Sequence, residues 1–420
     1  MLYERWRVVA RECAQETALR DLATGRSWTF AQLAAGTEPA GLSRARNHLA
    51  CLNGTGPEFI FTLLCAWRRG QMVCPLETGA TPPVLTQVPT PDICLLKTTS
   101  ATTGAAKHVA FTNAQLAADA DNIVATMGLR RDSPNLGVIS LAHSYGFSNL
   151  VLPLLLHGIP LVLASSALPE ALRQAAATGG NWTLPAVPAL WRAWHEAGAI
   201  PANIRLAISA GAPLPLPLEQ AVFERSGLKL HNFLGSTECG GIAYDASDTP
   251  RTDASFAGTA MRNVSLSCGK DGCLVVSGAN VGDTYWPEPE ARLGGGIFHT
   301  SDLVELRNDG VFLRGRASDL INVAGRKVAP ESIEQALLTH HAVRECLVLG
   351  LPSKDAARGD EVAAVVATRE EVTTEQLRQF LQTRLPDWQV PREWKLVKPL
   401  TGNARGKLSR AEWRQNWSTD

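Results

Sequence analysis

The chain has 420 residues, which at roughly 150 residues per domain predicts two or three folding units and excludes a single small module. Lys and Arg together number 40, and so do Asp and Glu, so no net charge favours nucleic acid or an anionic membrane. With 45% hydrophobic and 19% charged residues, the composition excludes a disordered chain. We expect a globular protein with a small-molecule partner.

The cysteines and the N-terminus indicate a cytoplasmic protein. The nine cysteines contain no C-x-x-C pair and are interpreted as buried, reduced thiols. Charged residues within positions 1–15 interrupt any apolar signal-peptide segment. Segment 133–169 carries no Lys, Arg, Asp or Glu, but prolines and a glycine interrupt its most apolar part, 150–164, which is shorter than the ~20 residues of a spanning helix. We expect no membrane span there, but a buried helix followed by a buried strand at 161–163.

The first part of the chain alternates short apolar runs with helical patterns. Residues 59–69 have apolar positions at helical spacing and end at a glycine, which predicts a helix. Runs 93–96, 138–141 and 161–163 predict strands, and 217–225 predicts a further helix. This alternation predicts a layered α/β architecture.

From about Gly258 the pattern changes to short strands, expected at 274–277, 303–306 and 311–313, with a hairpin turn at 308–310. A compact α+β unit follows Gly315-Arg316, with a helix from Pro330, strands at 346–349 and 362–367, and a capping-box helix from Thr373. We therefore predict α/β and α+β classes in two domains: a large domain over 1–317 with layered α/β subdomains and a small β-rich one, and a small mobile C-terminal domain over 318–420.

A hydroxyl-rich loop follows the strand at 93–96. Residues 98–107 contain several Thr and Ser, one glycine and Lys107, which supply hydroxyl, amide and cationic donors suited to a polyphosphate. The spacing is not that of a G-x-x-x-x-G-K-[ST] loop. A solvated turn is the commoner explanation of such a composition taken alone.

A carboxylate stands beside a hydroxyl in segment 232–238, after the apolar run 228–230. Glu238 next to Thr237 can hold Mg²⁺ against phosphate oxygens, which are the ligands this ion prefers. Taken alone, a Thr-Glu pair is more often part of an exposed turn.

Two further segments carry chemistry. Asp302, with Arg316 fourteen residues later, can accept the two hydroxyls of a ribose, or the two can form a plain hairpin ion pair. Near the C-terminus, segment 402–407 presents Lys407 from a glycine-containing loop, or forms part of a solvated basic face.

The order of these segments is similar to that of the adenylate-forming superfamily of acyl-CoA synthetases, nonribosomal-peptide adenylation domains and luciferases, and most resembles acyl- or aryl-CoA ligases. The resemblance spans about 28–410 and includes Ser140–Gly146, Val187-Pro188 and Ser209–Leu214. Relative to the family, the part before the phosphate loop is short, and Leu234 replaces an aromatic residue.

The resemblance implies a role for each matching residue. Lys407, Thr237 and Glu238 would be catalytic, and Glu238 would also hold Mg²⁺. Ser318 would be the hinge, and Gly325 would lie on the thiol-acceptor side. The nucleotide-binding residues would be Thr99, Ser100, Thr102, Thr103, Gly104, Lys107, Ala210, Gly211, Ala212, Asn232, Leu234, Asp302 and Arg316. The substrate pocket would contain His143, Ser144, Tyr145, Gly235 and Gly241.

The implied reaction activates a carboxylic acid with ATP and Mg²⁺, releases pyrophosphate, and transfers the acyl group from the adenylate to the thiol of CoA or of a carrier-protein phosphopantetheine. Segment 142–145 lacks the Asp with which amino-acid-activating relatives hold the α-ammonium group, which favours an aryl or fatty acid. The alternative is a non-catalytic nucleotide- or acyl-binding protein derived from the same fold.

Overall fold

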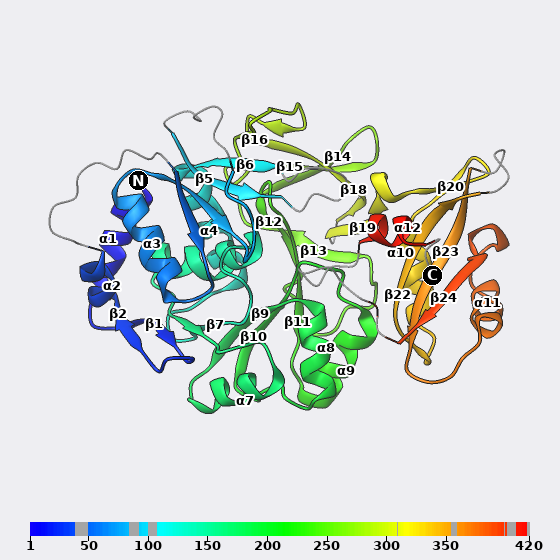
Figure 1. Ribbon diagram of the computed structural model, residues 1–420, viewed down its shortest axis with the longest axis horizontal. Coiled ribbons are helices and arrows are strands. Elements are labelled where there is room, and N and C mark those ends of the chain that lie inside the picture. Colours follow the sequence, from blue (N-terminus) through cyan, green and yellow to red (C-terminus); the bar gives the residue numbers. More distant parts are fainter. Residues whose placement is uncertain are drawn as a thin grey trace.

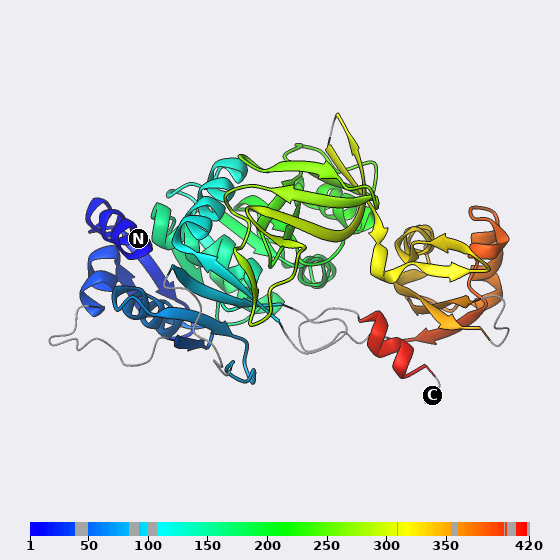
Figure 2. The same ribbon diagram turned by 90° about the horizontal axis from the view of Figure 1, so that it is seen from above.

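The computed structural model describes residues 1–37, 49–83, 92–99, 107–308, 310–353, 359–398, 400 and 409–417. It has a large body that extends from α1 (Leu2–Glu12) to β19 (Gly310–Arg316) and a smaller body that begins at β20 (Ile321–Val323) (Figure 1). A narrow connection of the chain joins the two bodies (Figure 2). The domain boundary that we place at 317/318 stays a prediction, since independent folding of the two parts is a separate property.

A long mixed sheet runs through the large body. Its strands from β1 to β11 pair in parallel, apart from β1 with β2, whereas β11 and the strands beyond it pair antiparallel. In sheet order the strands are β14 (Ser265–Cys268), β15 (Cys273–Ser277), β18 (Ile297–Arg307), β19 (Gly310–Arg316), β13 (Phe256–Ala260), β12 (Gly240–Tyr244), β11 (Leu230–Ser236), β10 (Ile204–Ser209), β9 (Trp182–Ala186), β7 (Asn135–Gly137), β8 (Leu161–Leu163), β1 (Thr17–Asp21) and β2 (Ser27–Thr29), with β17 (Leu293–Gly294) beside β18.

A second sheet lies beside the first in the large body. Its strand β5 is almost wholly buried, as expected of an apolar strand within a layered α/β fold. In sheet order the strands are β16 (Thr284–Trp286), β6 (His108–Thr112), β5 (Ile93–Thr98), β4 (Met72–Leu76) and β3 (Leu49–Asn53). The antiparallel pair β5–β6 fixes the two described ends of the predicted phosphate loop, Thr99 and Lys107.

The helices of the large body begin with recognisable signals. Proline occupies the first turn of α3, α7, α8 and α9, and capping boxes begin α2 and α4. They are α1 (Leu2–Glu12), α2 (Phe30–Gly36), α3 (Pro57–Arg68), α4 (Asn113–Met127), α5 (Ser144–Gly146), the π-helical turn η1 (Phe147–Val151), α6 (Leu152–His157), α7 (Pro169–Ala177), α8 (Pro188–Glu196) and α9 (Leu216–Ser226).

The small body packs the helices α10, α11 and α12 on a three-stranded sheet. A capping box between Thr373 and Gln376 begins α11, as predicted. Its elements are β20 (Ile321–Val323), β21 (Arg326–Val328), α10 (Pro330–Leu338), β22 (Val343–Pro352), β23 (Asp360–Thr368), α11 (Thr374–Gln382), η4 (Asp387–Gln389), β24 (Glu393–Val397) and α12 (Arg410–Gln415), after the short helix η2 (Ala317–Asp319).

Most of the sequence-based elements are confirmed. The helices at 59–69 and 217–225, the buried helix followed by a strand at 161–163, and the β18–β19 hairpin are all present. The strand predicted at 138–141 is wrong, because β7 ends at Gly137 and the apolar residues after it form the irregular approach to α5. An apolar run does not distinguish a strand from a buried loop.

The predictions for the cysteines and for a membrane span have different outcomes. Six cysteines are buried, but Cys51 and Cys65 are half-buried and Cys268 is exposed, so the uniform prediction of buried thiols is wrong. Cys268 belongs to β14, the last strand of the long sheet, where few atoms cover it. In the described part of the chain, no helix is long and apolar enough to cross a membrane.

The half-buried imidazole of His108 makes stability depend on pH. Its ring stacks on Trp286 with centroids 6.0 Å apart, and its Nδ1 has no hydrogen-bond partner among the described residues. Burial lowers the pKa of His108, so the folded chain disfavours a proton that the unfolded chain accepts below about pH 6.5.

We predict that stability falls as the pH drops through that unfolded value and continues to fall until the lowered folded pKa is reached. His108→Phe keeps the ring on Trp286 and removes the titration, so this variant should lose less stability between pH 8 and pH 5.5 than the parent chain. Urea unfolding at the two pH values measures the loss. Equal losses in the two proteins would show that His108 does not contribute.

Candidate functional site

The base of the predicted phosphate loop is a closed hairpin. Thr98 pairs with His108 across β5 and β6, and the amide of Thr99 donates to the carbonyl of Lys107 at 2.8 Å. The Thr99 hydroxyl donates to the same carbonyl at 3.2 Å. Four predicted nucleotide-binding residues of the loop lie outside the described residues, namely Ser100, Thr102, Thr103 and Gly104. The described base nevertheless fixes where the loop leaves the sheet.

The turn between β11 and β12 carries Thr237 and Glu238 and is fastened by its backbone. The amide of Gly282 donates to the Glu238 carbonyl at 2.8 Å, and the Asn280 side chain donates to the Cys239 carbonyl at 2.6 Å. Asn280 and Cys239 are fully buried. The backbone of the turn is thus held from the segment before β16, while the Thr237 and Glu238 side chains remain half-exposed.

A tyrosine joins this turn to the phosphate-loop base. The Tyr285 hydroxyl donates to Oε1 of Glu238 at 2.9 Å, and the Lys107 ammonium lies 5.8 Å from the Tyr285 ring centroid. Lys107 pairs with Glu290, and this contact lowers the pKa of the Glu290 carboxyl. The structure therefore brings Lys107 and Glu238, which are far apart in the sequence, to two sides of one aromatic ring.

This group fits a magnesium ion held with phosphates. Mg²⁺ is commonly bound by one or two carboxylates together with substrate phosphates. Among the described residues, no three or more His, Cys, Asp or Glu side chains cluster in a way that could hold a metal ion. Within the same part of the chain, no hydrogen bond is donated to the second carboxylate oxygen of Glu238. Glu238 is thus suited to hold such an ion alongside a bound nucleotide.

Asp302 and Arg316 face each other across the β18–β19 hairpin. They are direct cross-strand partners, and the Arg316 Nε donates to Asp302 Oδ1 at 2.9 Å. The Asp302 carboxylate raises the pKa of Arg316. This geometry is that of a plain hairpin ion pair. The bond uses only Oδ1 of Asp302, so the other carboxylate oxygen can accept a hydrogen bond from a ligand. The ribose role stays a prediction.

Three predicted segments meet at one edge of the long sheet. Segments 143–145, 210–212 and 237–238 each follow the carboxyl end of a parallel strand, β7, β10 and β11 respectively. Ligands in open α/β sheets bind outside this edge. The topology therefore places the three segments around one region, as a substrate between them requires.

The residues predicted to border the adenine form an open edge. Ala210 is buried, whereas Gly211 and Ala212 are exposed, and Gly211 has a φ of +86°. Asn232 lies beside Ser209 in the sheet, and Leu234 is half-buried against the core. These positions offer backbone and apolar surface to a flat ring. Nucleotide contact by each of them stays a prediction.

The predicted acyl-pocket residues differ in exposure. Tyr145 is buried, with its ring 6.0 Å from that of Phe233 and its hydroxyl donating to the Ile208 carbonyl at 3.3 Å. Nδ1 of His143 accepts from the Tyr145 amide at 3.3 Å and caps α5, while His143 and Ser144 remain half-buried. Gly235 and Gly241 are cross-strand partners beside Phe233. Tyr145 and Phe233 therefore form an apolar wall.

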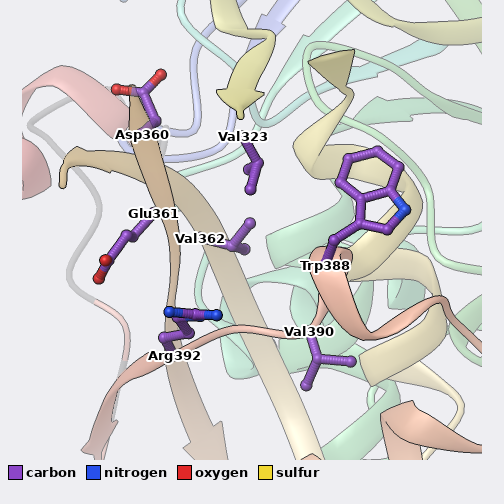
Figure 3. Close-up of a pocket in the computed structure, with 7 residues that line it drawn as sticks. All are labelled: Val323, Asp360, Glu361, Val362, Trp388, Val390 and Arg392. Atoms are coloured by element: carbon purple, nitrogen blue, oxygen red, sulfur yellow. The ribbon is translucent and has the colours of Figure 1, made fainter. Parts of the chain in front are cut away.

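The predicted hinge residue follows directly after strand β19, and the predicted thiol-acceptor residue lies in the small body. Ser318 is in η2 and donates to its neighbour Asp319. Gly325 has a φ of +80° at the tip of the β20–β21 hairpin. Lys407 lies outside the described residues. The small recess of Figure 3 contains none of the predicted site residues and is lined by Val323, Asp360, Glu361, Val362, Trp388, Val390 and Arg392.

Sequence reasoning missed Tyr285 and Glu290. Both lie in segment 284–290, between two of the recognised motifs, and neither stands in a pattern that a single sequence makes conspicuous. The available signal was a tyrosine in a short strand followed by an acidic residue, which occurs in many strands. Only the pairing of β16 with β6 brings them to the site.

Family models and similar proteins show to which family this chain belongs. A model described as AMP-binding enzyme matches residues 79–286, and one described as AMP-binding enzyme C-terminal domain matches 332–407. A 2-succinylbenzoate–CoA ligase of Bacillus cereus (strain Q1) is 30% identical over 334 residues, covering 76% of this chain and 69% of the relative. This chain belongs to the AMP-binding enzyme family.

Other relatives agree. A feruloyl-CoA synthase of an Amycolatopsis species is 28% identical over 349 residues, which is 78% of this AMP-binding enzyme and 70% of the relative. The fold matches ATP-bound MatB of Rhodopseudomonas palustris, with 20% identity, a TM-score of 0.87 and 99% of both chains covered. It also matches MenE of Bacillus subtilis in complex with the acyl-adenylate OSB-AMP, with 21% identity, a TM-score of 0.83 and coverage of 98% and 97%.

The resemblance read from the sequence is confirmed. The AMP-binding enzyme has the expected mixed α/β architecture with a large and a small body, and its relatives are acid–thiol ligases. The chain is an AMP-forming acid–thiol ligase, and the alternative of a non-catalytic binding protein is not supported.

Proposed function

We propose that this enzyme activates an aryl carboxylic acid with ATP and Mg²⁺ and transfers the acyl group to CoA. The reaction forms an acyl-adenylate and pyrophosphate, and the thiol of CoA then displaces AMP to give a thioester. The observation that carries the proposal is the meeting of Lys107 and Glu238 at Tyr285, which provides a cation and a metal-binding carboxylate beside the base of a hydroxyl-rich loop.

The aryl preference is supported by the pocket and by the relatives. The segment at 142–145 contains no carboxylate to hold an α-ammonium group. Tyr145 and Phe233 are buried with ring centroids 6.0 Å apart, and an aryl group that reaches them can pack at offset or edge geometry. The relatives are named for feruloyl and 2-succinylbenzoate groups, both aromatic, and for CoA as the acceptor.

The chemistry follows from charge. A carboxylate that attacks the α-phosphorus of ATP brings two anions together, so the barrier is largely electrostatic. The magnesium ion neutralises phosphate charge when bound. Glu238 would hold it, Thr237 would donate to the α-phosphate, and Lys107 would exchange Glu290 for a phosphate oxygen. The existing Lys107–Glu290 pair keeps the lysine in place before the nucleotide arrives.

The small body would supply the last cation. Lys407 would reach the reacting phosphate from the tethered lobe, and rotation about Ser318 would then bring Gly325 toward the CoA thiol. In the present arrangement two ion pairs join α8 to β22, Arg192 with Glu345 and Arg344 with Glu196, the latter at 3.0 Å. A rotation of the small body would break both pairs.

The substrate class is tested with a panel of acids. We expect pyrophosphate release in the presence of ATP and Mg²⁺ with cinnamate- and benzoate-type acids, and at least tenfold lower kcat/KM with fatty acids and α-amino acids. Addition of CoA should give the acyl-CoA, detected by mass spectrometry. A preference for α-amino acids, or release without any acid, would contradict the proposal.

A cytoplasmic location also remains a prediction.

The role of Lys407 is tested against Lys398, which stands earlier in the sequence and outside segment 402–407. Lys407→Ala should lower the rate of acid-dependent pyrophosphate release by about a hundredfold, because the lost cation acts on charge developed in the transition state. Lys398→Ala, which removes an exposed lysine nearby, should leave the rate within about twofold. Equal rates for the two variants would assign Lys407 to a solvated basic face.

A further inference from the structure

A buried network of polar side chains lies behind the site and has no role in the mechanism above. The Lys97 ammonium donates to the Ser148 hydroxyl at 3.1 Å, and Ser148 donates to Oδ2 of Asp119 at 2.6 Å. Lys97 and Asp119 are 4.0 Å apart. The exposed fractions are 4% for Lys97, 1% for Asp119 and 3% for Ser148. These three residues come from β5, α4 and η1, and we call them the buried triad.

The buried triad is a costly arrangement for a protein core. Removing a lysine from water is strongly unfavourable unless it is paired, and burial lowers the pKa of the Lys97 ammonium while Asp119 opposes that shift. The Phe111 and Phe147 rings, at 4.8 and 5.8 Å, give it further support. Apolar residues of similar volume often stabilise a core equally well, so packing alone does not explain why this ion pair is buried.

The other end of the triad touches the backbone of the turn that carries Glu238. Oδ1 of Asp119 accepts a hydrogen bond from the Gly241 amide at 3.1 Å. Gly240 has a φ of +65°, and a Cβ placed there would lie 2.0 Å from the same oxygen. Asp119 therefore lies directly against residues 240 and 241 and leaves space for nothing larger than glycine.

The triad also connects three predicted parts of the site. Lys97 stands two residues before Thr99, where the phosphate loop begins, and Ser148 stands three residues after Tyr145 of the acyl-pocket segment. Gly241 stands three residues after Glu238. One buried network thus contacts the strand of the phosphate loop, the acyl-pocket segment and the metal-binding turn.

We propose that Asp119, with Lys97 and Ser148 as its buried partners, is a positioning residue that holds the 236–241 turn, and with it Thr237 and Glu238, in register with the base of the phosphate loop. The proposal rests on the proposed function of that turn. Lys97 and Ser148 orient the carboxylate of Asp119, and its other oxygen accepts from the Gly241 amide. None of the three touches the nucleotide or the acid.

Two double variants separate the positioning role from charge balance. Both K97M/D119N and K97M/D119L remove the buried ion pair and keep the core filled. Asn at 119 retains an oxygen that can accept from Gly241 and an amide that can donate to Ser148, whereas Leu leaves the Gly241 amide without an acceptor. The two variants differ in whether the side chain at 119 can bond to the Gly241 amide and to the Ser148 hydroxyl.

We expect K97M/D119N to keep kcat for acid-dependent pyrophosphate release within about threefold of the parent enzyme, and K97M/D119L to lose about tenfold or more, with little change in KM for the acid. Both should keep a cooperative thermal transition. If Leu at 119 prevents folding, K97M/D119A takes its place. Equal kcat in the two double variants would overturn the proposal.

Hydrogen exchange tests the anchor without turnover. The peptide that spans 236–244 should exchange faster in K97M/D119L than in K97M/D119N, while peptides of α9 exchange alike in both. Equal exchange of 236–244 in the two variants would also overturn the proposal. If the parent enzyme released no pyrophosphate with any acid, the proposed function would fail, and the exchange result alone would decide whether the triad fixes the turn.

Discussion

The hydrogen bond from Tyr285 to Glu238 joins two sheets of the large body at the place where the chemistry is expected. Tyr285 belongs to β16 of the smaller sheet, and Glu238 follows β11 of the long sheet. The Gly282 amide, donating to the Glu238 carbonyl, makes a second link from the same segment. Because both links end on one residue, the carboxylate is fixed relative to the phosphate-loop hairpin, whose strand β6 pairs with β16.

The arrangement explains how a chain with zero formal charge can bind a polyanion. The positive groups are local: Lys107 lies near Tyr285, and Arg316 lies beside Asp302. Each is already paired with a carboxylate, so the cations are held in defined places before a ligand arrives. Binding then replaces one anionic partner by another, which costs less reorganisation than ordering a free side chain.

Much of the fold was predictable from local patterns, and the reasons differ between elements. The helix α11 was predicted from Thr373 and Gln376, because a capping box is a local signal. The β18–β19 hairpin was likewise predicted from the residues of its turn. The strand expected at 138–141 failed, since the end of β7 depends on which neighbours it pairs with. Pairing across sheets is a long-range property that periodicity does not contain.

The site shows the same division. Glu238, Asp302 and Lys107 stand in recognisable segments and were predicted from the sequence. Tyr285, Glu290 and Asp119 were not, because each acquires its partner only through tertiary contacts between segments more than a hundred residues apart or between separate sheets. A hydroxyl or carboxylate that positions another residue carries no sequence signal of its own.

We propose that Glu238, oriented by Tyr285, holds the magnesium ion of bound Mg·ATP. Calorimetric titration of ATP into the enzyme, with excess Mg²⁺ and then with EDTA, tests it most directly. We predict that Mg²⁺ tightens binding of ATP to the parent enzyme by about tenfold or more, and that Glu238→Gln abolishes this gain and Tyr285→Phe reduces it. An undiminished gain in the Glu238→Gln variant would contradict the account.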